Sequence, residues 1–237
     1  AKGLKTDYLN GPIDLVLHKG EILGLFGLVG SGRSELVRAI LGIDKSSEGN
    51  LWINGKECNN FSLGKIIENG VAYVPEDRQS EGLIMDMSVK DNITLASLND
   101  FQKGPFIDQS AERKAAKDII EKVFIKVGSM SNLVSSLSGG NQQKVVLGKW
   151  ILHSPNIFIL DEPTAGIDVG TKGRIYDFVN ELSDNGISIL FVSSEPEELL
   201  RIADRVLVMY QKHIIAEFPI EKTSKKNLMA TAIGETV

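Results

Sequence analysis

The chain has 237 residues, of which 42% are hydrophobic and 24% charged, and its formal net charge is -5. This composition is that of an ordinary folded protein and excludes the fibrous and disordered classes. The negative balance gives no electrostatic footprint for nonspecific binding to nucleic acid, so no nucleic-acid partner is expected. No apolar run approaches the roughly 18 residues that span a bilayer, and the single Cys58 cannot form an internal disulfide. The sequence therefore predicts a cytoplasmic protein whose membrane role, if any, needs a partner.

The first third of the chain alternates short apolar runs with turns. An apolar run over 22–26 leads into a glycine-rich turn, and apolar residues at helical spacing follow over 33–41, with Gly42 as a helix stop. The run 51–53 before Asn54-Gly55 indicates a small hairpin, and 71–74 another short strand. This part of the chain predicts strand, loop and helix around the turn at residues 27–32.

The middle of the chain changes character. Residues 77–137 are richer in charge, and their apolar residues recur with a helical period. One helical face is expected to consist of Ala115, Ile119, Ile120, Val123 and Val127. We interpret this stretch as a helical subdomain inserted into an α/β core.

The last third returns to strand and helix alternation. The runs 157–160 and 187–192 are fully apolar, as buried parallel strands are, and an amphipathic helix closed by Gly186 lies between them. The runs 206–210 and 213–218 are expected to pair as a hairpin, although Gln211-Lys212 lacks the glycine that a tight turn prefers. The chain is thus predicted to be one α/β domain over 1–237, with a core of about 1–76 and 141–237 and a helical subdomain of about 77–140.

A phosphate-binding loop is expected at the glycine-rich turn. The segment fits G-x-x-x-x-G-K-[ST] except that arginine stands in place of lysine, and its candidate nucleotide-binding residues are Gly27, Leu28, Val29, Gly30, Ser31, Gly32, Arg33, Ser34 and Glu35. The alternative, a merely structural turn, is disfavoured by the strand before it and the helix after it. The guanidinium of Arg33 is planar and wider than an ammonium, and the carboxylate of Glu35 repels triphosphate. The loop is expected to bind nucleotide but to be poor at γ-phosphate chemistry.

Two further motifs name a family. Leu137-Ser-Gly-Gly-Asn-Gln142 is followed by Asp161-Glu-Pro-Thr164 at the end of an apolar run. Together with the loop, they resemble the ATP-binding-cassette superfamily from about Ile13 to about Phe218. The resemblance implies a P-loop NTPase fold with a RecA-like core, a small antiparallel β subdomain and an inserted helical subdomain.

The resemblance also implies roles and cofactors. ATP and Mg²⁺ are expected, with Ser34, Glu76 and Asp161 as magnesium ligands and Glu162 as the catalytic carboxylate that polarises the attacking water. The signature residues expected to contact the γ-phosphate held by a partner cassette are Ser138, Gly139, Gly140, Asn141 and Gln142. A plain helix-capping role is the alternative for Ser138.

Departures from the family pattern point to one branch of it. Family members usually carry glutamine where Glu76 stands and histidine where Ser194 stands, and Ser194 lacks the reach of an imidazole. With Arg33, three γ-phosphate contacts are altered while Glu162 is kept. This combination resembles the C-terminal cassette of tandem ATPases that energise import of ribose-, galactose- or xylose-type sugars. The alternative is a non-hydrolysing, regulatory nucleotide-binding domain of the same transporter.

The resemblance further implies partners and a location. These are an N-terminal or second cassette, transmembrane permease subunits and, indirectly, a substrate-binding protein, with the chain peripheral on the inner face of the membrane. A start at Ala1 agrees with a piece of a longer polypeptide or with a processed initiator methionine. Two residues keep alternatives: Tyr8 either stacks on adenine or packs against the protein, and Asp168 either acts across the cassette dimer or caps a helix.

Overall fold

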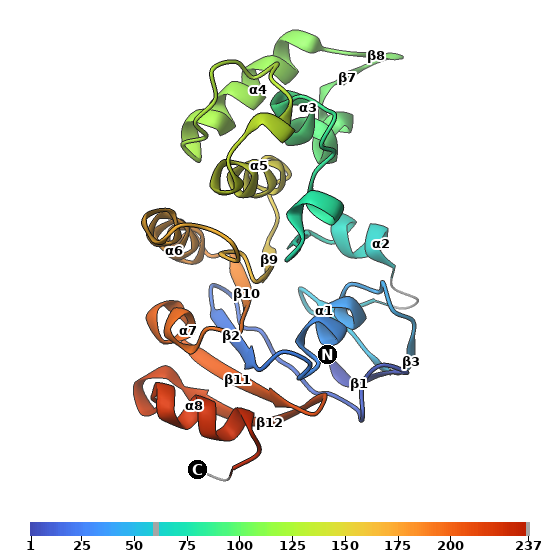
Figure 1. Cartoon of the computed structure of the whole chain (residues 1–237). Helices are drawn as coiled ribbons and strands as arrows, with labels where there is room; N and C mark the ends of the chain where they lie inside the picture. Colours follow the sequence, from blue (N-terminus) through green and yellow to red (C-terminus); the bar gives the residue numbers. More distant parts are fainter. Residues whose placement is uncertain (59–61, 236–237) are drawn as a thin grey trace. The chain divides into compact units, whose positions relative to one another are not determined.

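The computed structural model describes residues 1–58 and 62–235, which form two compact units (Figure 1). Unit 1 comprises Ala1–Ala72, Asn156–Glu162 and Tyr176–Val237, and unit 2 comprises Tyr73–Pro155 and Pro163–Ile175. The chain leaves unit 1 and returns to it twice, so unit 2 is an insertion.

A six-stranded sheet forms the core of unit 1, in the order β12-β11-β2-β10-β9-β6. Its strands are β2 (Ile22–Gly27), β6 (Val71–Val74), β9 (Ile157–Asp161), β10 (Ser188–Ser193), β11 (Arg205–Tyr210) and β12 (His213–Pro219). Neighbours β9, β10, β2 and β11 run parallel, and β12 pairs antiparallel with β11. All residues of β2 and β10 are buried, as expected for strands covered on both faces. The predicted α/β fold and its parallel apolar strands are confirmed.

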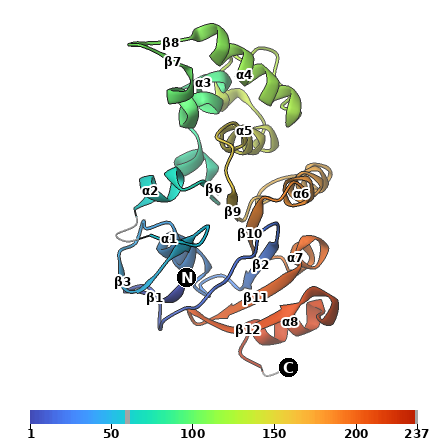
Figure 2. The ribbon, with the colours of Figure 1, turned by 180° about the vertical axis from the view of Figure 1, so that it is seen from behind.

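Helices cover both faces of this sheet. Helices α7 (Pro196–Ile202) and α8 (Lys225–Ala232) pack on one face, and α1 (Arg33–Ile40) lies on the other, as the two opposite views show (Figures 1 and 2). The other helical elements that reach unit 1 are α2 (Leu63–Glu68), α6 (Val169–Asp184) and η4 (Ile220–Lys222). Gly42, at a φ of 65°, follows α1 as the predicted stop.

Short antiparallel pairs complete unit 1. Strand β1 (Lys2–Thr6) pairs with β3 (Ser46–Asn50), and β4 (Trp52–Ile53) pairs with β5 (Lys56–Glu57) around the predicted Asn54-Gly55 turn. These pairs match the small antiparallel β subdomain expected from the sequence. The β11–β12 hairpin forms too, with a two-residue turn in which Gln211 and Lys212 take positive φ values of 46° and 63°. This turn therefore forms without the glycine it usually requires.

Unit 2 is mainly helical. Its elements are η1 (Arg78–Gly82), α3 (Val89–Thr94), η2 (Leu95–Phe101), β7 (Gln102–Lys103), β8 (Phe106–Ile107), α4 (Gln109–Lys122), η3 (Val134–Ser136) and α5 (Gly139–Leu152). Helix α3 packs against α4 and α5, and the two short strands form a hairpin. The helical character predicted for 77–137 is confirmed, whereas the exact subdomain limits of about 77 and 140 stay a prediction.

The expected apolar face of the α4 segment is only partly right. Ala116, Ile119 and Val123 are buried, but Ala115 and Ile120 are only half-buried. Helix α4 ends at Lys122, so Val127 lies outside it. The buried face is shifted because it includes a polar residue, Glu112. The Glu112 carboxylate accepts a hydrogen bond from the Thr94 hydroxyl (2.8 Å) and forms an ion pair with Lys90 (2.8 Å).

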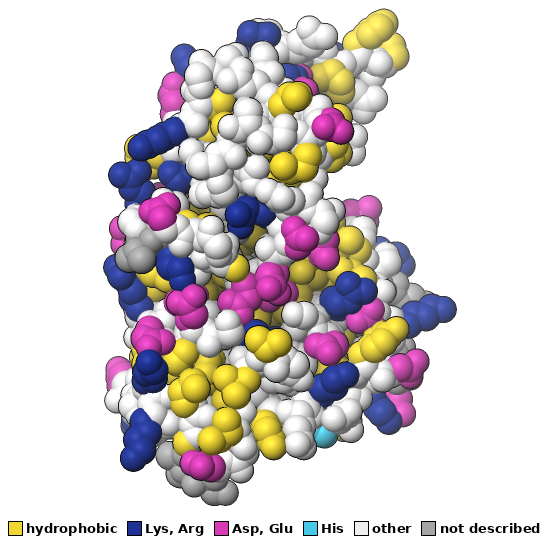
Figure 3. Space-filling model, viewed as in Figure 1, with side chains coloured by type: hydrophobic (Ala, Val, Ile, Leu, Met, Phe, Trp, Pro, Cys, Tyr) yellow, Lys and Arg dark blue, Asp and Glu magenta, His cyan; other side chains and the backbone are white. Residues whose placement is uncertain are grey.

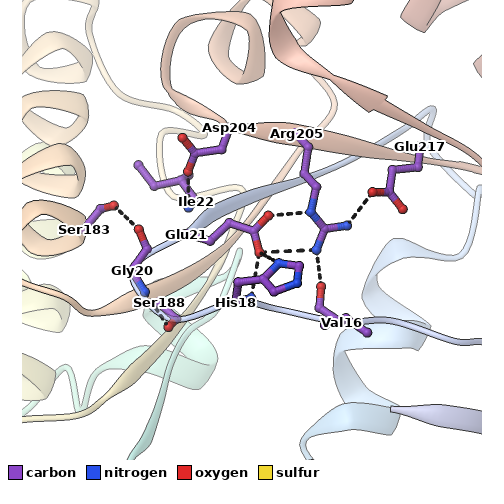
Figure 4. Close-up of polar contacts among 10 residues, drawn as sticks. All are labelled: Val16, His18, Gly20, Glu21, Ile22, Ser183, Ser188, Asp204, Arg205 and Glu217. Atoms are coloured by element: carbon purple, nitrogen blue, oxygen red, sulfur yellow. Dashed lines mark hydrogen bonds and ion pairs between the residues drawn. The ribbon is translucent and has the colours of Figure 1, made fainter.

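A buried ion pair lies at the amino end of β2 (Figure 4). Glu21, 9% exposed, accepts hydrogen bonds from the Arg205 guanidinium and from the backbone N–H of His18 (2.7 Å), whose ring nitrogen Nδ1 lies 3.0 Å from the same carboxylate. Arg205 also donates to Glu217 (2.9 Å) and to the carbonyl of Val16. Burial alone would raise the pKa of Glu21, but the hydrogen bonds from Arg205 and His18 outweigh it and lower this pKa below its usual value.

Neighbouring contacts fix the same end of the central strand. The backbone N–H of Gly20 donates to Ser188 (3.1 Å), the hydroxyl of Ser183 donates to the Gly20 carbonyl (2.9 Å), and the N–H of Ile22 donates to Asp204 (2.8 Å) (Figure 4). The start of β2 is thereby tied to the elements around it. Because β2 is rigid and buried, these contacts also fix the position of its carboxyl end.

Lys149 of α5 gives a pH-dependent prediction. Burial lowers the pKa of its ammonium to about 8, although the group donates to the Gly82 carbonyl (2.6 Å) and lies 5.3 Å from the ring of Trp150. The unfolded chain keeps this proton up to about pH 10.5, so the penalty of burying the charge is present at neutral pH and is relieved between pH 8 and 10.5. The unfolding free energy of wild type should therefore rise with pH over this range, and that of Lys149→Met should lack this rise. We expect the difference between the two, wild type minus variant, to increase by up to about 3 kcal/mol.

Chemical denaturation at several pH values measures this difference. Lys114→Met, on the exposed side of α4, is the matched control and should show no such rise. A wild-type minus Lys149→Met difference that stays flat from pH 8 to 10.5 would contradict the burial argument.

The surface is mixed in charge. Figure 3 shows Lys and Arg side chains interspersed with Asp and Glu over the face in view. Among the helices of residues 1–58 and 62–235, none combines the length and apolar character required to cross a membrane.

Candidate functional site

The phosphate loop is formed as the sequence predicts, between β2 and α1. Gly30 and Gly32 take φ values of 81° and 105°, and the N–H of Ser31 donates to the Leu28 carbonyl (2.9 Å). Helix α1 begins at Arg33 without a side-chain cap, so its first N–H groups are left for a ligand. A curled glycine backbone followed by a helix N-terminus is an arrangement that binds phosphate.

Close packing explains two of the glycines. A Cβ on Gly27 would lie 2.2 Å from the Ser31 hydroxyl and 2.9 Å from the Met209 carbonyl oxygen. A Cβ on Gly32 would lie 2.8 Å from the Cα of Lys212. The loop is therefore pressed against the β11 strand and its turn, and neither position accepts a larger residue without moving the backbone.

Arg33 forms the most informative contact of the site. Its Nη2 lies 3.0 Å from Oε1 of Glu162, and both side chains are about one-tenth exposed. The same Oε1 accepts a hydrogen bond from the N–H of Ser194 (2.7 Å). The structure thus brings together three predicted site residues, from the loop, the end of β9 and the end of β10. One carboxylate oxygen of Glu162, Oε1, is therefore held by two donors.

The backbone at Glu162 is unusual. It takes a φ of 44°, a value that non-glycine residues rarely adopt, and its N–H donates to the Val192 carbonyl (3.0 Å). The strain turns the chain sharply after the last residue of β9, Asp161, which is 3% exposed. Such outliers cluster at functional sites, where the surrounding structure holds them in place.

Two buried polar atoms of the loop are left over. The hydroxyl of Ser31 and Nη1 of Arg33 have no hydrogen-bond partner among the described residues. Both residues are buried, with Ser31 6% and Arg33 9% exposed. Burying a donor without a partner costs about 1–3 kcal/mol. A ligand rich in acceptor oxygens, such as a polyphosphate, would satisfy both atoms.

The predicted metal donors of unit 1 suit magnesium. The Ser34 hydroxyl and the Asp161 carboxylate are hard oxygen ligands, and Mg²⁺ is usually held by one or two carboxylates together with substrate phosphates. In the part of the chain that the structure describes, no three or more His, Cys, Asp or Glu side chains form a cluster that could hold a metal alone. The donor set therefore fits an ion that a bound nucleotide helps to hold. Glu76, the third predicted ligand, lies in unit 2 and is exposed.

The signature residues are in unit 2, at the start of α5. Ser138 takes the N-cap position, but its hydroxyl makes no capping bond and accepts instead from the Asn141 amide (3.0 Å). The Asn141 carbonyl oxygen accepts from the N–H of Lys126 (2.9 Å), and the buried Gln142 accepts from Gln79 (3.0 Å). The capping alternative for Ser138 holds only for its backbone position, and its exposed side chain is available to a partner.

Gly139 and Gly140 are packed closely within unit 2. A Cβ on Gly139 would lie 2.6 Å from Nη2 of Arg78, which donates through Nη1 to the Ala165 carbonyl (3.1 Å). A Cβ on Gly140 would lie 3.1 Å from Thr171. A Cβ at either position would require the Arg78 or Thr171 side chain to shift, and the small residues leave the helix N-terminus open to a phosphate.

The two residues left with alternatives have different outcomes. Asp168 caps α6, because its carboxylate accepts from the N–H and the hydroxyl of Thr171 at 3.0 and 2.8 Å. The hydrogen bonds from Thr171 lower the pKa of Asp168. Its action across a dimer stays a prediction. Tyr8 is 56% exposed, and both of its alternatives, packing against the protein and stacking on adenine, stay predictions.

Sequence reasoning missed Lys212. Its N–H donates to the Ser31 carbonyl (2.7 Å), and its Nζ lies 3.5 Å from Oε1 of Glu35. No motif contains this residue. The only signal was the two-residue gap between the apolar runs of β11 and β12, which the sequence assigns to a turn but not to a place beside the loop.

Known proteins resemble the chain over most of its length. A family model described as ABC transporter matches residues 11–165, more than half of the chain. The Ribose import ATP-binding protein RbsA of Corynebacterium glutamicum is 42% identical over 99% of the chain, and that of Clostridium tetani is 45% identical over 94%. The chain spans 44% of each of these relatives, less than half of their length.

Solved structures support the fold. The ADP conformation of MJ1267, an ATP-binding cassette of an ABC transporter, has a TM-score of 0.81 and 24% identity, covering 99% of this chain and 97% of that one. The dimeric structure of MJ0796, a bacterial ABC transporter cassette, has a TM-score of 0.80 and 22% identity, covering 92% and 97%. Together with the family model and the curated relatives, the loop and signature geometry shows that the chain belongs to the ATP-binding-cassette family of ABC transporters.

Proposed function

We propose that this chain is the C-terminal cassette of a tandem ATPase that drives import of a ribose-type sugar. The observation that carries the proposal of a ribose-type import ATPase is the identity of 42–45% to ribose import ATP-binding proteins across 94–99% of the chain but only 44% of their length. The C-terminal placement rests on the departures from the family pattern at Arg33, Glu76 and Ser194. A second cassette in the same polypeptide accounts for the remaining length. Its partners are then that cassette, the permease subunits and, through them, a sugar-binding protein. This places the chain on the inner face of the membrane.

The residues have the following proposed roles. The loop 27–35 binds ATP. Ser34 and Asp161 hold Mg²⁺ with the phosphates, and Glu162 is the carboxylate that orients the attacking water. The role of Glu76 as a magnesium ligand stays a prediction. Bound magnesium supplies charge neutralisation of the phosphate oxygens. Ser138, Gly139, Gly140, Asn141 and Gln142 complete the nucleotide site of the partner cassette, and Ser194 takes the place of the histidine that family members use at the γ-phosphate. The helical segment of about 77–140 is the part proposed to meet the permease.

We also propose that this chain's own nucleotide site hydrolyses ATP poorly. The support is the pairing of Glu162 with Arg33 at 3.0 Å, in a loop whose next residues are Ser34 and Glu35. Because Oε1 of Glu162 already accepts from Arg33 and from the N–H of Ser194, this oxygen can take a proton from water only after one of these contacts is released. A purely regulatory, non-hydrolysing domain is the second candidate, and the same ion pair is the observation that favours it.

Glu162→Gln in the tandem protein, reconstituted with its permease and sugar-binding protein, tests both statements. We expect ribose-stimulated ATP hydrolysis to fall less than about 3-fold, whereas the same substitution at the corresponding glutamate of the partner cassette should reduce it by about 100-fold or more. Equal losses from the two substitutions would show that the site on this chain hydrolyses as well as its partner's. An absence of any sugar-stimulated turnover in wild type, with a panel of pentoses and hexoses, would contradict the proposed transport function.

A further inference from the structure

The turn between β11 and β12 places a lysine against the phosphate loop. Lys212 donates its N–H to the Ser31 carbonyl (2.7 Å). Its Cα is so close to Gly32 that a Cβ placed on Gly32 would lie 2.8 Å from it. The turn is held on its other side by Asn10, whose amide donates to the Gln211 carbonyl (2.9 Å). Both the backbone and the side chain of Lys212 are thus brought to the loop from a segment about 180 residues later in the sequence.

The backbone of this turn is strained. Gln211 and Lys212 both have positive φ values, 46° and 63°, which cost a non-glycine residue about 1 kcal/mol or more each. Glycine or asparagine would make the same turn more cheaply. A strained position held by the surrounding contacts is a reason to ask what its side chain does.

The phosphate loop and the turn beside it carry two cations, Arg33 and Lys212, which are paired differently. Arg33 has one edge of its guanidinium on Glu162, so its positive charge is largely balanced within the protein. Glu35, in the first turn of α1, adds a negative charge that would repel a nucleotide. The Nζ of Lys212 lies 3.5 Å from Oε1 of Glu35, and the two side chains are 32% and 31% exposed. At this distance the ammonium balances Glu35 while staying open to a further anionic partner.

Two buried polar atoms of the loop have unused hydrogen-bonding capacity. The Ser31 hydroxyl and Nη1 of Arg33 are buried without a partner among the described residues. Lys212 contacts the backbone of the same loop at Ser31 and Gly32. Its flexible four-carbon stem allows the ammonium to reach an anionic ligand bound at the loop.

We propose that Lys212 is a phosphate-contacting residue of this chain's nucleotide site, which offsets Glu35 and supplies the flexible ammonium that the loop lacks because Arg33 stands in place of lysine. This assignment rests on the proposed binding of ATP by the loop. It adds a residue from outside every recognised motif of the chain. The β11–β12 turn then does more than close the sheet, because it completes the phosphate site.

Nucleotide binding to the 237-residue chain tests the assignment, with ATP and adenosine as probes in the presence of Mg²⁺. Lys212→Gly and Lys212→Asn remove the ammonium and suit the positive φ of the turn, so both variants should keep or raise the thermal midpoint. We expect each to weaken ATP binding by about 10-fold and to leave adenosine binding unchanged, as loss of one charge-assisted contact predicts. Lys212→Arg should retain ATP affinity within about 3-fold.

Gln211→Gly is the matched control, since it relaxes the same turn and keeps the ammonium. It should bind ATP as wild type does. If wild type binds ATP and Lys212→Gly binds it equally tightly, or loses ATP and adenosine affinity alike, the assignment of Lys212 is overturned and ATP binding by the loop stands. If wild type binds no ATP, both proposals fall.

Discussion

Ser138→Arg in the tandem protein is expected to lower sugar-stimulated ATP hydrolysis by about 100-fold or more. Ser138 is exposed at the N-terminus of α5, where Gly139 and Gly140 leave the first N–H groups of the helix open. In the proposed function these groups face the γ-phosphate bound by the partner cassette. A long side chain at this position fills the space through which the phosphate reaches the backbone, and losing one such donor to a transition state costs about 10²–10³ in rate.

The fold should tolerate this substitution. The Ser138 hydroxyl accepts a hydrogen bond from the Asn141 amide (3.0 Å) and is otherwise exposed, and Arg at an exposed N-cap costs about 1 kcal/mol. Ser135→Arg, at another exposed serine three residues earlier, is the matched control and should leave turnover unchanged. ATP binding to the partner cassette should persist in both variants. Wild-type turnover in Ser138→Arg would contradict the proposal that this chain completes its partner's site.

The local parts of the site could be predicted from sequence because they are encoded locally. The strand, loop and helix around Gly27–Ser34 follow from an apolar run, closely spaced glycines and a helical period, all within about twenty residues. Asp161 and Glu162 could be placed at a strand end for the same reason. Since parallel strands end at one edge of a sheet, the meeting of Glu162 with the loop also followed from topology.

The pairing partners could not be predicted, because they depend on side-chain conformation and on distant segments. The sequence indicated that the wider guanidinium of Arg33 would make the loop poor at γ-phosphate chemistry, but not that it would bind Glu162. The contact of Lys212 with Glu35 joins residues 177 positions apart through a turn that lacks the usual glycine. The shift of the buried face of α4 had a similar cause, because the burial of Glu112 depends on Lys90 and Thr94 from other elements.

Arg205→Ala is expected to have the largest effect on stability, about 3–5 kcal/mol. Its guanidinium, 14% exposed, donates to Glu21, Glu217 and the Val16 carbonyl at the start of β2 (Figure 4). The substitution leaves the buried carboxylate of Glu21 with only the His18 contacts, and an unpaired buried charge costs this much. Chemical denaturation of the 237-residue chain measures the change. Glu217→Ala removes an exposed partner of the same arginine, so it should cost at most about 1 kcal/mol.

The pH dependence distinguishes a lost ion pair from a merely lost side chain. In wild type the pKa of Glu21 is below its usual value of 4.5, so this carboxylate contributes stability above that value and loses it as pH falls through the lowered pKa. In Arg205→Ala the arginine no longer lowers the pKa of Glu21, so the effect of burial, which raises this pKa, is no longer outweighed. Protonation of Glu21 at low pH then removes the unpaired buried charge and so reduces the loss of stability that the substitution causes. The difference in unfolding free energy between wild type and Arg205→Ala should therefore be largest near pH 7 and shrink below pH 5. A difference that is constant across this range would mean that Arg205 stabilises the start of β2 by packing and not through the charge of Glu21.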